Sequence, residues 1–335
     1  MKLTNCILDI DRVVMRPPVR SSPHPGWQRA YDNKIIPENV YRFYCSADYF
    51  SLDKTPKFLD DEDRFLFSFL HNILEGIRHA FTEANDLVEI IKDTQGKGYS
   101  PVKRIKNETW DANADERQSR SVRYLIVLMN GVLDQLAEVV SMFFHGDIPE
   151  LTVGRASFAV LRDFARHPFS PQTGIVTPKE HRFEELHAVL VETIETSGSE
   201  TQWFELLKLY RNKLAHLGTS MFPILRLHDD KGEFYSFLPN RFPIFHESGI
   251  SFPNKSKTEP SGVQDNADYA KENYIHQDVV EYSERLLEKV YIVIDRCFKV
   301  LCSTYIEFKS FDLNESALKS LKNKKSKYSF KYFDK

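Results

Sequence analysis

The sequence contains few cysteines and glycines, and it has no large excess of charge of either sign. Its four cysteines include no Cys-x-x-Cys pair and are too sparse in 335 residues for a disulfide framework or a zinc module. Its 13 glycines form no GxGxxG or GxxxxGK(S/T) motif, which disfavours glycine-rich nucleotide-binding folds. With 45 Lys and Arg against 48 Asp and Glu, the net charge of −3 restricts any contact with nucleic acid to local basic patches. We therefore expect a protein of the reducing cytoplasm that is not a histone-like binder.

The sequence also lacks a long apolar run that is free of charged residues. The most apolar windows, 124–144 and 286–301, are each interrupted by Asp, Glu, Lys or Arg, which are costly inside a membrane. The first residues include an acidic side chain at Asp9 and do not resemble a signal peptide. These patterns predict a soluble, cytoplasmic protein without a membrane partner.

Aromatic residues are abundant, with 25 Phe and 15 Tyr, and many of them recur at helical spacing. This spacing and the helix-terminating residues predict helices at about 60–93, 114–144, 151–165, 178–196, 199–217 and 274–305. Two β-prone runs flank the turn-forming segment 229–232 and predict a β-hairpin. The expected fold class is mainly α, an antiparallel helical bundle with a β-hairpin insertion.

Three regions are expected along the chain. Residues 1–57 contain several prolines without sustained periodicity and predict an irregular N-terminal arm. Residues 58–306 hold the helical domain, in which 146–198 form a helical insertion and 219–273 form the hairpin and a loop. Residues 307–335 form a basic tail, whose lysines and aromatic residues suit either single-stranded RNA binding or a disordered, solubilising role.

The most specific chemistry lies at the end of the helix predicted at 199–217. Arg211 and His216 form an Arg-x4-His pair, and the amide of Asn212 follows the arginine directly. At about 100° per residue, these side chains and Lys208 share one sector of the helix. An apolar stripe is expected on another face, formed by Trp203, Leu206, Tyr210, Leu214 and Leu217. Cations, an amide and an imidazole are therefore expected to converge.

These residue types suit cleavage of a phosphodiester without a metal. Histidine titrates near neutral pH and can transfer protons, and the guanidinium of arginine binds phosphoryl oxygens through a rigid fork of donors. RNA supplies its own nucleophile, the 2′-hydroxyl, so the protein has to contribute only proton transfer, phosphate binding and alignment. Because no HExxH or His-x3-His motif is present, no catalytic metal or other cofactor is expected.

In this motif and in its helical order the chain resembles the HEPN superfamily, whose members are small helical bundles with an Arg-x4-6-His motif near a helix end. The resemblance implies a metal-independent endoribonuclease, often a toxin or antiviral defence effector, whose site is completed by the two motifs of a homodimer. It also implies Arg211 and His216 as the catalytic pair and Asn212 as a positioning residue, with RNA and a protein antitoxin or regulator as partners. Lys208 and Lys213 are candidates for contacts with the RNA backbone. Some HEPN toxins carry a tyrosine two residues after the histidine that an antitoxin modifies; here that residue is Gly218, so this route of regulation is not expected.

The same spacing occurs at three further places, namely Arg162/His167, Arg182/His187 and Arg241/His246. The pair at 241–246 contains a proline and therefore does not lie on a helix. The pair at 182–187 has Phe after the arginine and two carboxylates that would repel phosphate. The pair at 162–167 has a polar residue after the arginine and a predicted helix end, so it remains an alternative to Arg211 and His216.

A second interpretation of residues 211–216 involves no catalysis. Cationic side chains complement the dipole at the C-terminal end of any helix, and a histidine there can bind the last carbonyl groups. On this interpretation the protein is a non-catalytic helical scaffold or a nucleic-acid-binding module.

Overall fold

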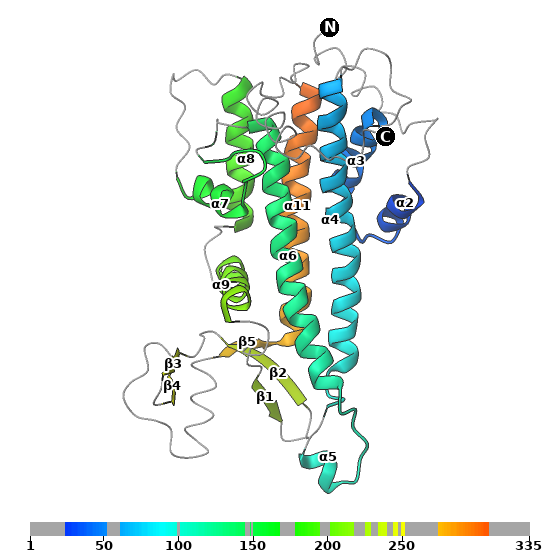
Figure 1. Cartoon of the computed structure of the whole chain (residues 1–335), viewed down its shortest axis with the longest axis vertical. Helices are drawn as coiled ribbons and strands as arrows, with labels where there is room; N and C mark the ends of the chain where they lie inside the picture. The colour runs from blue at the N-terminus through cyan, green and yellow to red at the C-terminus, as the bar shows by residue number, and fades with distance from the viewer. Residues whose placement is uncertain are drawn as a thin grey trace, which may run out of the picture. The chain divides into compact units, whose positions relative to one another are not determined.

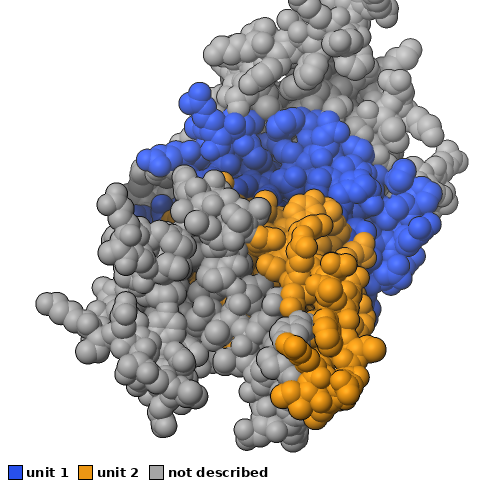
Figure 2. Space-filling view, turned by 60° about the horizontal axis from the view of Figure 1, so that its bottom comes forward, with its two compact units in different colours: residues 1–82, 131–201, 289–335 blue, residues 83–130, 202–288 orange. Residues whose placement is uncertain are grey.

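A computed structural model describes residues 24–51, 61–98, 101–144, 148, 150–167, 178–194, 202–217, 225–228, 234–239, 244–246, 249–251 and 274–307. Helices make up 80% of this part, which confirms the expected mainly α fold. The chain divides into two compact units, coloured separately in Figure 2. Unit 1 comprises residues 1–82, 131–201 and 289–335, and unit 2 comprises residues 83–130 and 202–288.

Three long helices contribute residues to both units: α4 (Asp61–Thr94), α6 (Ala114–Phe144) and α11 (Val279–Glu307). In Figure 1, α6 and α11 run in the opposite direction to α4. Side chains join these helices within each unit. In unit 1, the rings of Phe81 and Tyr291 meet edge to face at 5.9 Å. In unit 2, Lys92 forms a 2.8 Å ion pair with Glu284, and Gln118 donates a hydrogen bond to a backbone carbonyl of α4. These contacts confirm a helical bundle.

Unit 1 also contains α2 (Pro25–Asp32), α3 (Glu38–Ser51), α7 (Phe158–Arg166) and α8 (Pro178–Ile194). The prediction of an irregular arm over residues 1–57 is therefore wrong for 25–51. Pro25 does not break a helix but begins one, because the first helical position needs no N–H donor. Trp27 of α2 stacks on Tyr44 of α3 at 3.8 Å, and neither side chain is more than 1% exposed. These two short helices are thus part of the core.

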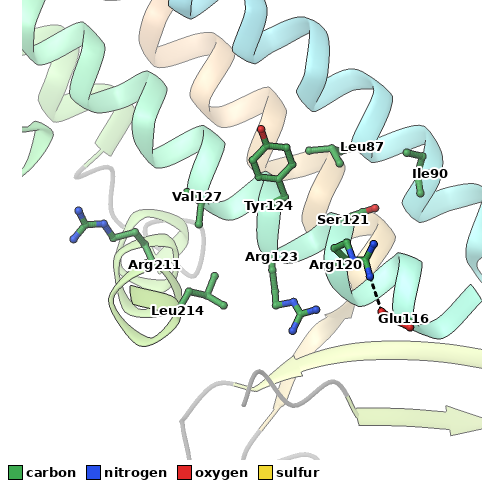
Figure 3. A pocket seen from close by; sticks show the side chains of 10 residues that line it. All are labelled: Leu87, Ile90, Glu116, Arg120, Ser121, Arg123, Tyr124, Val127, Arg211 and Leu214. Atoms are coloured by element: carbon green, nitrogen blue, oxygen red, sulfur yellow. Dashed lines mark hydrogen bonds and ion pairs between the residues drawn. The ribbon is translucent and has the colours of Figure 1, made fainter. Parts of the chain in front are cut away.

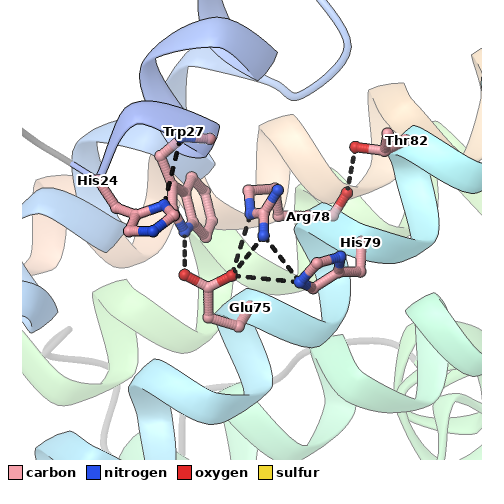
Figure 4. Close-up of polar contacts among 7 residues, drawn as sticks. His24, Trp27, Glu75, Arg78, His79 and Thr82 are labelled. Carbon is pink, nitrogen blue, oxygen red and sulfur yellow. Dashed lines mark hydrogen bonds and ion pairs between the residues drawn. The ribbon is translucent and has the colours of Figure 1, made fainter.

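A polar cluster fastens α2 to α4 (Figure 4). The indole Nε1 of Trp27 donates a 2.6 Å hydrogen bond to Glu75, and Arg78 donates to the other oxygen of the same carboxylate at 3.0 Å. The guanidinium of Arg78 also lies 5.9 Å from the centre of the Trp27 ring. Each of these groups therefore has a partner within unit 1.

The helix predicted at 151–165 begins later than expected, at Phe158. Its N-terminal backbone is capped by carboxylates of α6 rather than by its own sequence. Glu138 accepts hydrogen bonds from the N–H groups of Gly154 and Ala156, and Asp134 accepts one from Phe158 at 3.0 Å. These hydrogen bonds stabilise the turns at residues 151–157. Because the acceptors are distant in sequence, the local pattern did not reveal them and predicted a helix.

Unit 2 contains α5 (Pro101–Ile105), α9 (Gln202–Leu217) and two small sheets. The predicted hairpin is confirmed, since β1 (Leu225–His228) pairs antiparallel with β2 (Phe234–Pro239). The prediction of a helix at 274–305 is wrong for its first residues, because Tyr274–Asp278 form the strand β5, which pairs with β2. The carboxylate of Asp278 then accepts a 2.8 Å hydrogen bond from the N–H of Glu281 and caps α11. A second hairpin joins β3 (Ile244–His246) and β4 (Gly249–Ser251).

Parts of the earlier predictions lie outside the described residues, namely the loop at 252–273 and the tail beyond residue 307. Within the described residues, α6 is long and apolar enough to cross a membrane by length and composition, and 61% of its apolar window is buried inside the protein. A buried core helix of a soluble protein meets the same criteria.

Candidate functional site

Helix α9 carries the predicted site and is held by one packed face. Its buried side chains recur at helical spacing and are Trp203, Phe204, Leu207, Tyr210 and Leu214. Tyr210 is fully buried and meets the ring of Tyr282 edge to face at 5.8 Å. Burial raises the pKa of both tyrosines, so both hydroxyls stay protonated. The predicted stripe is shifted slightly, because Leu207 takes the buried place expected for Leu206, which is half-buried.

Three of the five predicted site residues lie together on another face of α9. Arg211 is exposed, and its guanidinium donates a 3.2 Å hydrogen bond to the amide oxygen of Asn212. Lys208 is half-buried one turn earlier, at a position that shares this face with residues 211 and 212. Arg211 is thus held by a neighbouring amide while it remains open to a ligand.

His216 and Lys213 belong to the backbone of α9, but their side chains lie outside the described part of the chain. Residue 216 follows Asn212 by four positions, and helical geometry puts residues four apart on the same side. The expected convergence of His216 with Arg211 therefore stays a prediction.

A half-open cavity of about 1000 Å³ lies beside α9 within unit 2 (Figure 3). Its lining residues come from α4, α6 and α9 and are Leu87, Ile90, Glu116, Arg120, Ser121, Arg123, Tyr124, Val127, Arg211 and Leu214. We call this cavity the unit 2 groove. Arg211 therefore belongs both to the predicted motif and to the wall of a groove.

The unit 2 groove combines a cationic rim with an apolar floor. Arg120, Arg123 and Arg211 bring three guanidinium groups, against the single carboxylate of Glu116, which forms a 2.6 Å ion pair with Arg120. Figure 3 shows the guanidinium of Arg211 pointing away from those of Arg120 and Arg123. The three cations are therefore spread around the groove and do not meet at one point.

Sequence reasoning missed the two arginines of α6. Arg117, Arg120 and Arg123 recur every third residue in the first half of this helix, a pattern that brings cations to neighbouring positions on a helix surface. That spacing was the available signal. The position of α9 beside α6 could not be inferred from residues that are neighbours in the sequence.

The alternative motif, Arg162 and His167, has a different environment. The side chain of Arg162 is 8% exposed and forms a 2.8 Å ion pair with Asp163. Helix α7 ends at Arg166, and His167 follows it in an extended conformation. The two residues therefore do not lie on one continuous helix, and the guanidinium has little exposed surface for a phosphate. Of the other pairs, the side chain of Arg182 and the whole of Arg241 lie outside the described part.

Across the residues that the structure describes, no three His, Cys, Asp or Glu side chains are grouped so that they could hold a metal ion. The buried thiols of Cys297 and Cys302 on α11 have pKa values raised to about 12 by burial. They are therefore protonated thiols of the core at neutral pH and poor metal ligands.

No family model, curated protein or solved structure matches the chain. Its candidate function therefore rests on the chemistry of its own residues.

Proposed function

We propose that this protein is a metal-independent endoribonuclease of the HEPN type, with Arg211 and His216 of α9 as its catalytic pair. The observation that carries the proposal is the exposed guanidinium of Arg211, which Asn212 holds on a helix that is packed through its buried apolar side chains. His216 follows five residues later on the same helix. In this proposal α4, α6, α9 and α11 are the four helices of a HEPN-like bundle.

The reaction requires one proton acceptor and one group that binds the phosphate. His216 takes the proton of the 2′-hydroxyl as that oxygen attacks the adjacent phosphorus atom. The bond from phosphorus to the 5′-oxygen breaks, and the leaving oxygen takes up a proton. The products are a 2′,3′-cyclic phosphate and a 5′-hydroxyl. Arg211 donates hydrogen bonds to the non-bridging phosphoryl oxygens, where negative charge increases in the transition state.

Asn212 and the lysines of α9 would position the RNA. The amide of Asn212 restricts the guanidinium of Arg211 through their 3.2 Å hydrogen bond, which lowers the entropy lost when a phosphate binds. Lys208 and Lys213 would contact flanking phosphates, so RNA binding should weaken as salt increases.

The proposal includes a homodimer, because a second copy of α9 would bring a second imidazole to the leaving oxygen. It also includes a cytoplasmic role as a toxin or antiviral defence effector under the control of a protein antitoxin. A nucleic-acid-binding module without catalysis is the second candidate. The three arginines around the unit 2 groove favour it, because they can bind a polyanion without any proton transfer.

The test is an RNA cleavage assay on the purified full chain in the presence of EDTA. We expect cleavage that leaves 2′,3′-cyclic phosphate ends and that falls by about a hundredfold or more in His216→Ala, because a positioned acid or base contributes about that much. His79→Ala is the matched control, since its side chain is 69% exposed on α4 and does not line the groove. Circular dichroism checks that both variants fold.

Two results would overturn this assignment. Full activity in His216→Ala, or activity that is lost in Arg162→Ala but kept in Arg211→Ala, would exclude the α9 pair. RNA binding without cleavage, also when the protein is dimeric, would favour the non-catalytic module.

A further inference from the structure

The floor of the unit 2 groove is an exposed apolar surface. Within the described part of the chain, five large hydrophobic side chains are exposed: Ile90, Ile105, Trp110, Tyr124 and Val127. Three of them line this groove, namely Ile90 at 42%, Tyr124 at 45% and Val127 at 48% exposed. Leu87 and Leu214 complete the floor. Apolar side chains that gather in one exposed groove are typical of a binding surface.

The rim of the groove is cationic and its charges are separated. Arg120, Arg123 and Arg211 stand around the floor, and their guanidinium groups point in different directions (Figure 3). A site for one phosphate or one carboxylate needs donors that converge on it. Separated cations instead suit several anionic groups that are spaced along an extended ligand.

We propose that the unit 2 groove binds an amphipathic helix of a partner protein, with aliphatic side chains along one face and Asp or Glu residues beside them. The aliphatic side chains would cover Ile90, Val127 and Leu214, while the carboxylates would pair with the arginines of the rim. A groove between helices is a common seat for a helix whose apolar side chains recur every three to four residues. Arg211 hydrogen-bonds the neutral amide of Asn212, so the positive charge that it brings to the rim favours an acidic partner.

Single-stranded RNA fits this floor less well than a helix does. Proteins that bind single-stranded RNA stack its bases on aromatic rings, and the floor has one aromatic ring, Tyr124, among four aliphatic side chains. RNA at the groove is therefore the competing outcome of the test.

A docked helix would also cover Arg211. If α9 cleaves RNA, such a partner acts as an inhibitor, a consequence that rests on the proposed function. Binding of the helix does not rest on it, so the two proposals can fail separately.

The test uses a fluorescein-labelled synthetic helical peptide with leucines at i, i+3, i+4 and i+7 and glutamates on the flanking positions. One comparison peptide has the same composition with its leucines distributed around the helix, and another has lysines in place of the glutamates. A labelled single-stranded RNA is the fourth probe. Fluorescence anisotropy with the full chain measures the Kd of each probe.

Two pairs of variants locate the binding. We expect Val127→Asp to weaken binding of the acidic amphipathic peptide by about tenfold or more, because a charge replaces a central apolar contact. Ile105→Asp, at another exposed aliphatic residue outside the groove, should leave the Kd unchanged. Arg120→Glu should weaken the same peptide by about threefold or more, whereas Arg104→Glu on α5 should not.

The proposal holds if the acidic amphipathic peptide binds more tightly than both comparison peptides and Val127→Asp removes this preference. It is overturned if the acidic peptide binds no better than its rearranged version, or if Val127→Asp and Ile105→Asp behave alike. It is also overturned if RNA alone binds at the groove, with loss in Arg120→Glu. Each of these readouts is independent of RNA cleavage, so an inactive enzyme does not affect them.

Discussion

Units 1 and 2 place their large apolar side chains differently. Among the described residues, the eight largest fully buried side chains are Tyr210 in unit 2 and seven in unit 1, namely Trp27, Ile36, Tyr44, Phe81, Phe144, Phe158 and Phe298. The five large hydrophobic residues that are exposed in the described part all belong to unit 2. Among the described residues, unit 1 thus buries most of the largest side chains, whereas unit 2 exposes several apolar ones.

Two arginines, one in each unit, differ in exposure in the same way as the apolar side chains do. In unit 1, Arg78 is 12% exposed and is held by Glu75, next to the stacked ring of Trp27 (Figure 4). In unit 2, Arg120 is 71% exposed at the rim of the groove. The first arginine is largely enclosed by packed side chains, whereas the second reaches solvent while it pairs with Glu116.

The largest expected difference between the units comes from replacing a tryptophan in each. Trp27→Ala should lower the free energy of unfolding by about 3–5 kcal/mol, because it removes a buried ring and leaves a cavity. Trp110→Ala should lower it by less than about 1 kcal/mol, because that side chain is 42% exposed. Urea unfolding followed by circular dichroism measures both values. Similar losses of stability in the two variants would contradict the difference in burial between the two units.

A buried thiol in unit 1 and buried tyrosine hydroxyls in unit 2 should lower the stability of the two units at high pH, each in a different pH range. Burial raises the pKa of Cys297 in unit 1 to about 12, and it raises the pKa values of Tyr210 and Tyr282 in unit 2. These groups keep their protons when folded but lose them when unfolded, so their contribution to stability is present below the unfolded pKa and is lost above it. The loss should begin near pH 8.5 for the thiol and near pH 10 for the tyrosines, at about their ordinary pKa values.

The substitution Tyr282→Phe measures how much Tyr282 of unit 2 contributes to the loss of stability at high pH. Above about pH 10 this variant should lose stability less steeply than the unaltered protein, by about 1.4 kcal/mol per pH unit. The hydroxyl of Tyr282 has no hydrogen-bond partner among the described residues, so its removal should be tolerated at neutral pH. Urea unfolding between about pH 8 and pH 11 provides the measurement. Equal slopes in both proteins would show that Tyr282 ionises without unfolding.

The smallest expected effect concerns Arg120. Its ion pair with Glu116 joins residues four apart on an exposed helix surface, and such pairs contribute about 0.5 kcal/mol or less. Arg120→Gln should therefore leave the urea midpoint almost unchanged. A loss above about 2 kcal/mol would mean that this arginine stabilises unit 2 and is not primarily part of a binding rim.

The sequence predicted those elements whose signals are local. Helix α6 has the predicted bounds, and α4 differs by one residue at each end, because apolar spacing and terminal residues define such helices over a short stretch. The errors occurred where the partner is distant. Asn39 of α3 donates to Asp295 of α11, and β5 depends on pairing with β2. Neither contact can be inferred from neighbouring residues.

For the candidate site, too, the local features were predictable and the contacts between distant residues were not. The packing of α9 through Tyr210 and the exposure of Arg211 followed from helical spacing, and the structure agrees with both. The groove could not be predicted, because its floor combines Ile90, Val127 and Leu214 from three helices that are far apart in the sequence. The position of the imidazole of His216 stays a prediction.

A double-mutant cycle on RNA cleavage tests most directly whether Arg211 and His216 act together. Single-turnover rates would be measured in EDTA for the unaltered protein, Arg211→Ala, His216→Ala and the double variant. We predict that each single substitution lowers the rate by about a hundredfold or more and that the double variant is no slower than the slower single variant. Unchanged rates in the single variants, or effects that multiply fully in the double variant, would contradict a shared catalytic role.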